Sequence, residues 1–299
     1  MQKAKNTMSH HFELSEAAVK KFWSDGYLHL KNVFTPEEIQ RFRHYLDSIK
    51  AYETVSSLLI GDLLSDPCLS EFMVDDRIIA TTKKILGGNP VYFGDSAYKF
   101  NSAQVLPGKW HRDNVDRDNP QGPDWVGQYP IIRFGVFLQN HKHQGGGIMF
   151  RKYSHKKVLA NLKLEILKEE IWGNLNHCNR YMGNEVGDML IWNLRTAHAG
   201  MGRYLRGIHP RITISKRLAQ ILPSFLQATC NTQRYLVSAT FGLAGAHLDR
   251  YINRLKEREY MQQVWANIHH QPDKSQLLQE KGVTIMLPMN QSAAGELVV

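Results

Sequence analysis

Short segments with β-strand character fill the middle of the chain, and they restrict its possible folds more than any other feature. Runs of aromatic and β-branched residues cover 91–93, 97–100, 129–139, 146–150, 187–192 and 234–241. Many short strands that follow a helical segment are typical of double-sheet barrels of the jelly-roll type. We therefore predict a mainly β fold with flanking helices, built on a double-stranded β-helix (jelly-roll, cupin-like) barrel.

Helical patterns flank these strands. Apolar residues recur on one helical face in 15–23, 35–49, the second half of 51–86 and 245–262. Residues 158–176 carry a similar pattern between two groups of strands, which indicates an insertion. We expect a single domain over 1–299, divided as follows: a helical segment 1–90, a jelly-roll core 91–242 with insertions at about 156–180 and 203–232, and a C-terminal helix and tail 243–299.

The charge and cysteine content limit the possible partners and compartment. The chain carries a formal net charge of +9. Such a charge would suit a nucleic-acid binder or an enzyme that attracts an acidic small-molecule substrate. The basic residues are spread among acidic ones without a block of five, so we do not expect nucleic-acid binding. Three widely spaced cysteines, no signal-peptide pattern and no apolar run long enough for a membrane span predict a cytoplasmic protein without a membrane partner.

Three residues have the types and spacing of a metal site. His111 and Asp113 follow Pro107-Gly108, where a strand is expected to end, and residues at i and i+2 of an extended segment point to the same side. His198 lies after the strand that begins near Gly187. Two histidines and one carboxylate form the facial triad of non-haem iron(II) oxygenases, which leaves three coordination positions open. We predict that His111, Asp113 and His198 are the metal ligands and the catalytic centre.

Several blocks of the sequence, in order, resemble the phytanoyl-CoA dioxygenase-like family of iron(II) and 2-oxoglutarate-dependent oxygenases. These blocks are residues 22–30 with 34–39, 110–113, 146–156 and 187–198. The chain departs from the family at Lys152-Tyr153, where the family usually has Pro-Gly. The resemblance runs from about residue 19 to about residue 260. It implies a hydroxylase that uses Fe(II), 2-oxoglutarate and O2 to oxidise a small-molecule metabolite, with release of succinate and CO2.

The resemblance also implies a cation for the far carboxylate of 2-oxoglutarate, a role for which arginine is well suited. Arg234 opens the long strand 234–241, whereas Arg211 opens a shorter β-like piece at the commoner spacing after His198. We favour Arg234 and keep Arg211 as the alternative. Lys99 and Asn101 share one face of a predicted strand, where they either reach the cosubstrate or face solvent.

Three further residues are candidates for the substrate pocket. Arg133 lies inside an otherwise apolar strand, where an unpaired charge is costly. It therefore either binds an anion in the pocket or lies on an exposed face. Trp110 and Trp192 stand close to the predicted ligands, and we interpret them as pocket walls.

Two other functions are compatible with the same sequence. One is a barrel protein that binds a ligand or nucleic acid and catalyses no redox reaction at a metal. A metal-dependent lyase or isomerase would keep the metal but would not depend on 2-oxoglutarate. The sequence does not identify the substrate, because specificity in such barrels resides in loops and insertions.

Overall fold

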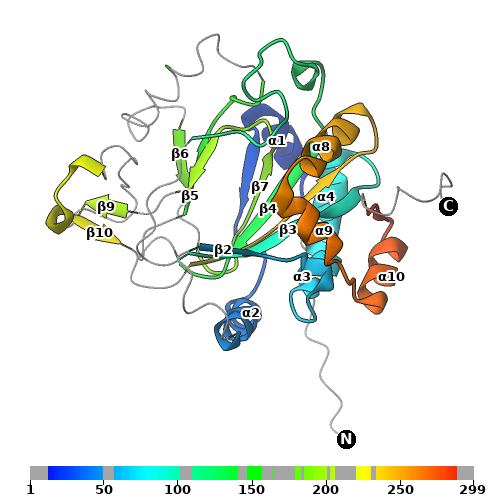
Figure 1. The fold of residues 1–299 in the computed structure, drawn as a ribbon, viewed down its shortest axis with the longest axis horizontal. Coiled ribbons are helices and arrows are strands. Elements are labelled where there is room, and N and C mark those ends of the chain that lie inside the picture. Colours follow the sequence, from blue (N-terminus) through cyan, green and yellow to red (C-terminus); the bar gives the residue numbers. More distant parts are fainter. Residues whose placement is uncertain are drawn as a thin grey trace, which may run out of the picture.

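The computed structural model describes residues 13–49, 57–101, 110–140, 147–156, 164, 179–182, 185–200, 203–205, 220–229 and 234–287 (Figure 1). Its α-helices are α1 (Glu16–Asp25), α2 (Pro36–Ser48), α3 (Ser70–Val74), α4 (Asp76–Leu86), α8 (Ala246–Lys256), α9 (Glu259–Ala266) and α10 (Pro272–Glu280). Its first six strands are β1 (Tyr27–Leu30), β2 (Ser57–Ile60), β3 (Val91–Asn101), β4 (Ile131–Phe137), β5 (Ile148–Arg151) and β6 (Asn179–Met182). The remaining strands are β7 (Met189–Asn193), β8 (His198–Gly200), β9 (Arg203–Leu205), β10 (Gln227–Thr229), β11 (Arg234–Gly242) and β12 (Thr284–Ile285).

The N-terminal helices form where the sequence predicts them, and local caps explain their ends. The Ser15 side chain accepts a hydrogen bond from a backbone N–H in the first turn of α1, and Gly26 ends this helix in the left-handed region. Thr35 and Glu38 form a reciprocal capping box at the start of α2, with a proline at its first position.

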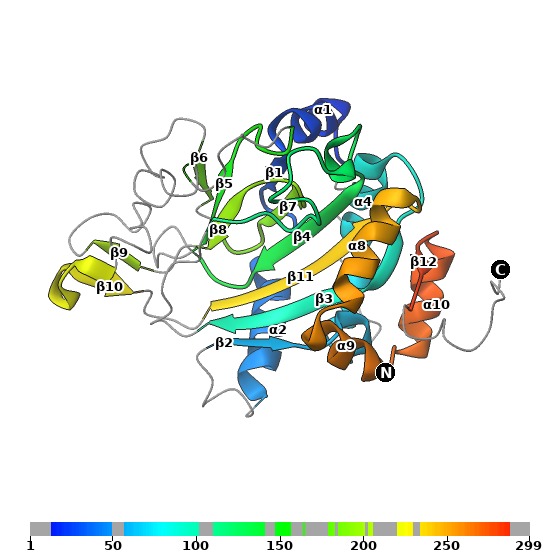
Figure 2. The same ribbon diagram turned by 45° about the horizontal axis from the view of Figure 1, so that its top comes forward.

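A seven-stranded sheet is the centre of the molecule. Its strand order is β1-β7-β4-β11-β3-β12, with β2 paired to β3 (Figure 2). The two short strands predicted at 91–93 and 97–100 are one strand, β3, which pairs with β11 across a register shift between Ala239 and Phe241. In the described residues this sheet is open and does not close into a barrel. The molecule therefore combines helices and sheet, and jelly-roll closure stays a prediction.

A smaller sheet of three strands has the order β6-β5-β8, and a separate ribbon pairs β9 with β10. Both views show β5 and β6 on the same side of the molecule, and Figure 2 shows β8 between β5 and β7, whereas the β9–β10 ribbon projects away from the sheets in both (Figures 1 and 2). The ribbon falls in the insertion predicted at 203–232. The insertion helix predicted at 158–176 and the tail beyond 287 lie outside the described residues, apart from Leu164.

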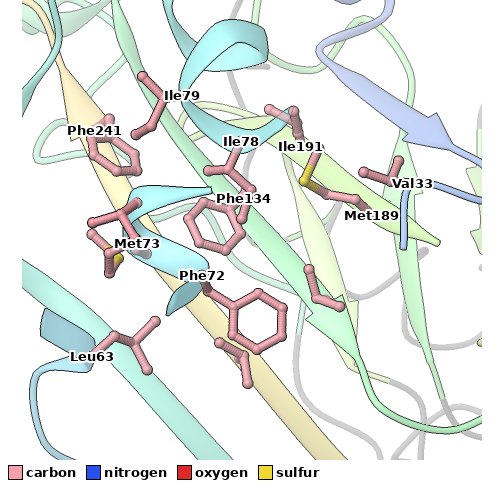
Figure 3. Packing of buried hydrophobic residues seen from close by; sticks show 14 of the residues in the cluster. Val33, Leu63, Phe72, Met73, Ile78, Ile79, Phe134, Met189, Ile191 and Phe241 are labelled. Carbon is pink, nitrogen blue, oxygen red and sulfur yellow. The ribbon is translucent and has the colours of Figure 1, made fainter. Parts of the chain in front are cut away.

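The main hydrophobic core lies on one face of the large sheet. Side chains from α3 and α4, among them Phe72 and Ile78, pack with Phe134 of β4 and Phe241 of β11 (Figure 3). Each of these four residues is 2% exposed or less. Because side chains alternate along a strand, the neighbouring residues of β4 point to the opposite face. This second face carries the site.

The second face has a polar belt between two apolar clusters. At one end, Phe93 and Ile131 pack against α8 and α9. At the other end, Phe137 and Trp192 pack against Phe150 of the small sheet. Between them the strands carry polar residues, which are Asp95 of β3, Arg133 of β4 and Thr240 of β11. A polar group in such a place needs a partner, since an unpaired buried charge is costly.

The C-terminal part differs from the expectation in two ways. The helix predicted at 245–262 is two helices, α8 and α9, separated at Glu257–Arg258. The sequence analysis predicted neither α10 nor β12, and β12 adds a parallel strand to the edge of β3. Among the described residues, no helix has the length and apolar character needed to cross a membrane.

Candidate metal centre

His111 and His198 are held side by side by their own backbones. They form an antiparallel bridge with two hydrogen bonds, from the N–H of His111 to the carbonyl of His198 at 3.0 Å and in the reverse direction at 2.9 Å. The two imidazole centroids are 4.3 Å apart. Residues that are 87 positions apart in the sequence therefore present their rings to one point.

Asp113 completes the group from the same extended segment as His111. Its backbone N–H donates to the carbonyl of Leu194 at 3.0 Å, which fixes the segment against the connection between β7 and β8. One carboxylate oxygen lies 3.7 Å from Nε2 of His111, and the other lies 3.7 Å from Nε2 of His198. One donor atom from each of the three residues lies within 4.8 Å of the others. The two 3.7 Å separations involve different oxygens of Asp113, and each lies within the distance of about 4 Å that separates two donors bound to one ion at about 2 Å.

His198 is prepared to act as a neutral ligand. Its Nδ1 lies 3.0 Å from the carbonyl of Thr196, and because a carbonyl can only accept, Nδ1 carries the proton. This leaves the Nε2 lone pair free toward Asp113. Burial and the neighbouring His111 lower the pKa of His198 to about 4. The side chain of His198 is 7% exposed and that of His111 is 44% exposed, so the site opens to solvent on the His111 side.

Asp113 stays ionised although it is buried. Burial on its own would raise the pKa of the carboxyl group, but the guanidinium of Arg133 and then the two histidines outweigh burial and lower that pKa to about 2. Two imidazoles and one carboxylate are the donor set that non-haem iron(II) prefers, with three positions left open. The residues therefore fit an iron(II) ion, and the fit rests on donor types, tautomer and separations.

Of the two places predicted for Arg133, the structure excludes the exposed face, and a place in the substrate pocket stays a prediction. Arg133 is paired with carboxylates of the protein itself. Its guanidinium donates to Asp113 at 3.2 Å and to Asp95 at 2.8 Å, and its Nε donates to the hydroxyl of Thr240 at 2.8 Å. The hydroxyl of Tyr251 from α8 also donates to Asp95 at 3.0 Å. The sequence analysis missed Asp95, Thr240 and Tyr251, although a carboxylate within the apolar strand β3 was a signal.

The two tryptophans belong to different apolar clusters next to the ligand strands. Trp192 is 3% exposed, and its ring centroid is 5.7 Å from that of His198. Trp110 is 6% exposed and packs with Met149, Ala197 and Ala199 in a separate small cluster. Both therefore border the ligand strands, and their role as walls of a substrate pocket stays a prediction.

The candidates for binding 2-oxoglutarate are described only in part. Arg211 lies outside the described residues. The structure describes the backbone of Arg234, Lys99 and Asn101, in which Arg234 pairs with Asn101 and Lys99 pairs with Leu236. Arg234 is six residues from Thr240 along β11, which corresponds to about 20 Å in an extended strand. No described contact joins any of these candidates to the three ligands.

A loop that directly follows the ligand segment is fixed by buried carboxylates. The side chain of Asp116 accepts a hydrogen bond from the backbone N–H of Asp124 at 2.9 Å, and Asp124 accepts one in return from the N–H of Asp116 at 3.1 Å. Arg250 of α8 donates to Asp116 at 2.7 Å. The loop therefore connects the Asp113 segment to α8, and the sequence analysis did not anticipate it.

Comparison with known proteins shows similarity at the level of the fold. No protein-family model matches the sequence, and no curated protein matches it. Solved structures do match. HygX from Streptomyces hygroscopicus, with nickel and 2-oxoglutarate bound, has a TM-score of 0.57 at 16% identity over 77% of this chain and 87% of its own. The α-ketoglutarate-dependent epimerase SnoN from nogalamycin biosynthesis has a TM-score of 0.52 at 16% identity, over 76% and 84%. EctD from S. alaskensis, with 2-oxoglutarate and 5-hydroxyectoine, has a TM-score of 0.51 at 13% identity, over 79% and 78%.

These likenesses concern the fold, because all three identities are low. Membership of the phytanoyl-CoA dioxygenase-like branch stays a prediction from the sequence blocks. The chain shares its fold with non-haem enzymes that depend on 2-oxoglutarate.

Proposed function

We propose that the protein is an Fe(II) and 2-oxoglutarate-dependent oxygenase that hydroxylates a small-molecule metabolite. The observation that carries the proposal is the convergence of His111, Asp113 and His198, which come from separate segments, on one point of this fold. A non-redox binding protein has no need for two imidazoles and an ionised carboxylate around a single open site. The donor set therefore favours the oxygenase over the non-redox alternative.

The three residues have distinct tasks in this proposal. His198 supplies a buried neutral imidazole whose orientation is fixed by Thr196. Asp113 supplies the negative charge, and His111 supplies the ligand on the solvent side. When bound, iron(II) would provide the redox chemistry that couples decarboxylation of 2-oxoglutarate to oxidation of a substrate carbon. The walls formed by Trp192 and Phe150 exclude water from the His198 side.

The cation for the far carboxylate of 2-oxoglutarate belongs to the same proposal. We propose Arg234, which opens the long strand β11, for this role and keep Arg211 as the alternative. Replacing Arg211, Arg234 and Lys99 by methionine one at a time should identify the residue, since loss of a charge-assisted contact weakens 2-oxoglutarate binding about tenfold or more.

The decisive experiment is an anaerobic titration of the protein with Fe(II) and 2-oxoglutarate. The wild type should develop the weak visible charge-transfer band of a chelated keto acid, and in air with ascorbate it should release succinate without a substrate. His111→Ala should lose both signals. Succinate release that is unchanged in His111→Ala would refute the metal assignment. Metal binding without 2-oxoglutarate dependence would instead favour the lyase or isomerase.

The substrate is the least constrained part of the proposal. The net charge of +9 favours an acidic or phosphorylated small molecule. A structure of HygX contains hygromycin B, and one of EctD contains 5-hydroxyectoine, whereas SnoN is an epimerase and SnoK a carbocyclase. Because the same fold hosts these different reactions, product analysis by mass spectrometry must accompany any substrate screen.

A further inference from the structure

Arg133 connects the proposed iron ligand Asp113 to a second buried carboxylate. Nη1 of Arg133 donates to Oδ2 of Asp113 at 3.2 Å, and Nη2 donates to Oδ2 of Asp95 at 2.8 Å. The Nε–H donates to Thr240 at 2.8 Å. Every nitrogen of the guanidinium therefore has a partner, and these partners come from three different segments. The arginine is held in one orientation before any ligand arrives.

The charges around Arg133 are nearly balanced. Asp95 and Asp113 contribute two negative charges against one positive charge, which leaves one net negative charge for a divalent cation. The side chain of Arg133 is 22% exposed, and those of Asp95 and Asp113 are 13% and 16% exposed. Asp95 also accepts a hydrogen bond from Tyr251. Asp95 therefore neutralises the arginine and keeps it in place, so that the arginine does not repel the metal.

The contact with Arg133 makes the two oxygens of Asp113 unequal. Oδ2 accepts a hydrogen bond from the guanidinium. Oδ1 lies 3.7 Å from Nε2 of His111 and Oδ2 lies 3.7 Å from Nε2 of His198, but among the described residues only Oδ2 also accepts a hydrogen bond. A carboxylate can bind a metal through one oxygen or through both, and the second mode occupies an additional coordination position. A hydrogen bond from a cation to one oxygen disfavours the second mode, because it draws electron density from that oxygen and makes it a weaker donor to the metal.

We propose that Arg133 is a positioning residue that makes Asp113 bind the metal through only one oxygen. This leaves a coordination position open for 2-oxoglutarate and the reaction. This inference rests on the proposed function. If each of the three protein residues contributed one donor atom, a six-coordinate ion would keep three open positions. A chelating keto acid would fill two of them. If Asp113 bound through both oxygens, only two positions would remain. The keto acid would then have to take both of them or displace the second oxygen of Asp113, and in either case its binding would be weaker. The role is specific to the guanidinium, since it needs donors toward Asp95, Asp113 and Thr240 at once.

The test separates metal binding from 2-oxoglutarate binding. In Arg133→Met, the carboxylate of Asp113 is released and can bind Fe(II) through both oxygens. Anaerobic competition with a chelator should show Fe(II) affinity that is unchanged or higher than in the wild type. The charge-transfer band at saturating Fe(II) should show 2-oxoglutarate affinity that is about tenfold lower, the usual size of effects from residues that contact a metal ligand.

Two further variants make the result decisive. Arg133→Met leaves Asp95 without its cation, so the double variant Asp95→Asn/Arg133→Met, which removes the pair together, provides the same readout if the single variant fails to fold. Arg77→Met is the matched control. Arg77 is 21% exposed and also joins two carboxylates, Asp75 and Glu38, but on the helical side of the molecule. This control should change neither affinity.

The outcomes distinguish the inference from the proposed function. A wild type that binds no Fe(II) or no 2-oxoglutarate would refute the proposed function itself. A functional wild type combined with an Arg133 variant that loses Fe(II) affinity would overturn the inference, because the arginine would then support the ligand rather than limit it. Equal 2-oxoglutarate affinity in the wild type and both Arg133 variants would overturn it as well.

Discussion

Gly26 ends α1 at a position where a side chain has no room. Its φ is 90°, and a Cβ atom there would lie 2.4 Å from Nδ1 of His155 and 2.6 Å from the hydroxyl of Thr196. Gly26→Ala therefore adds a steric conflict to the cost of the left-handed conformation. We expect a loss of about 2 to 4 kcal/mol in the free energy of unfolding, measured by denaturant titration.

Gly87→Ala is the matched control for this prediction. Gly87 also ends a helix, α4, with a φ of 75°, but a Cβ atom there would meet nothing within 4 Å. This variant should lose about 1 kcal/mol, the cost of the backbone conformation. Equal losses in the two variants would show that the neighbours of Gly26 move aside, and that the close packing around His155 is not essential.

His155 makes stability depend on pH. Burial, which outweighs a hydrogen bond to the carbonyl of Trp23, lowers the pKa of His155 from 6.5 to about 4. A group with a lowered pKa in the folded state is neutral there and protonated first in the unfolded chain. Its stabilisation is present above pH 6.5 and is lost as the pH falls toward 4, by about 3 kcal/mol in total.

Denaturant titrations at pH 7.5 and pH 4.5 check this sign. His155→Gln should flatten the acid side of the stability curve relative to the wild type, although His198, whose pKa is lowered in the same direction, continues to contribute. His269→Gln is a suitable control, because His269 is exposed. A curve for His155→Gln as steep as that of the wild type would contradict the prediction.

The residues of the site were predictable to different degrees. His111, Asp113 and His198 were accessible from the sequence, because their types and local spacing follow from metal chemistry. The surroundings of Arg133 were not. Its hydrogen-bond partners come from β3, the ligand segment and β11. A residue whose partners all lie far away in the sequence leaves two interpretations open, and the packing excludes one of them.

At the scale of elements, a buried carboxylate joins the edge of the large sheet to the C-terminal segment. Asp62 accepts hydrogen bonds from Tyr92 of β3 and from Ser96, and Nε2 of His270 lies 3.1 Å from it. Tyr92→Phe removes one donor and leaves Asp62 less well solvated. We expect a loss of about 1 to 3 kcal/mol in the free energy of unfolding. Tyr260→Phe, at a residue that is 42% exposed, should lose less than about 0.5 kcal/mol.

The element boundaries show what the sequence pattern could resolve. The strands β4, β7 and β11 match their predicted runs to within two residues at each end because their alternating or continuous apolar pattern is strong. Gly94 and the polar residues after it suggested a break in β3, yet Asp95 and Ser96 remain in the strand because they have buried partners. The strand β12 has two residues, and it forms because β3 offers an unpaired edge. Such a short strand has no pattern of its own.

The whole molecule places its candidate site at the boundary between two apolar clusters. The inner face of the large sheet is apolar where it meets α8 and α9, and apolar again where it meets the small sheet. The polar belt around Arg133 lies between these two regions and next to the histidine pair. A bound metal would therefore join the ligand segment 111–113 to β8 across the connection between the sheets. Metal binding should consequently stabilise the entire fold and not a single loop.

This coupling can be tested by measuring stability with a bound metal, without enzyme turnover. Ni(II), a redox-inert substitute, binds the folded state and should raise its free energy of unfolding by about 2.7 kcal/mol when its concentration is 100 times its dissociation constant. For a chain of this size, thermal unfolding should shift upward by about 5 °C. His111→Ala, which removes an exposed ligand with little effect on packing, should lose most of the shift. Because the chain has 14 histidines, a shift of equal size in this variant would mean that the ion binds elsewhere.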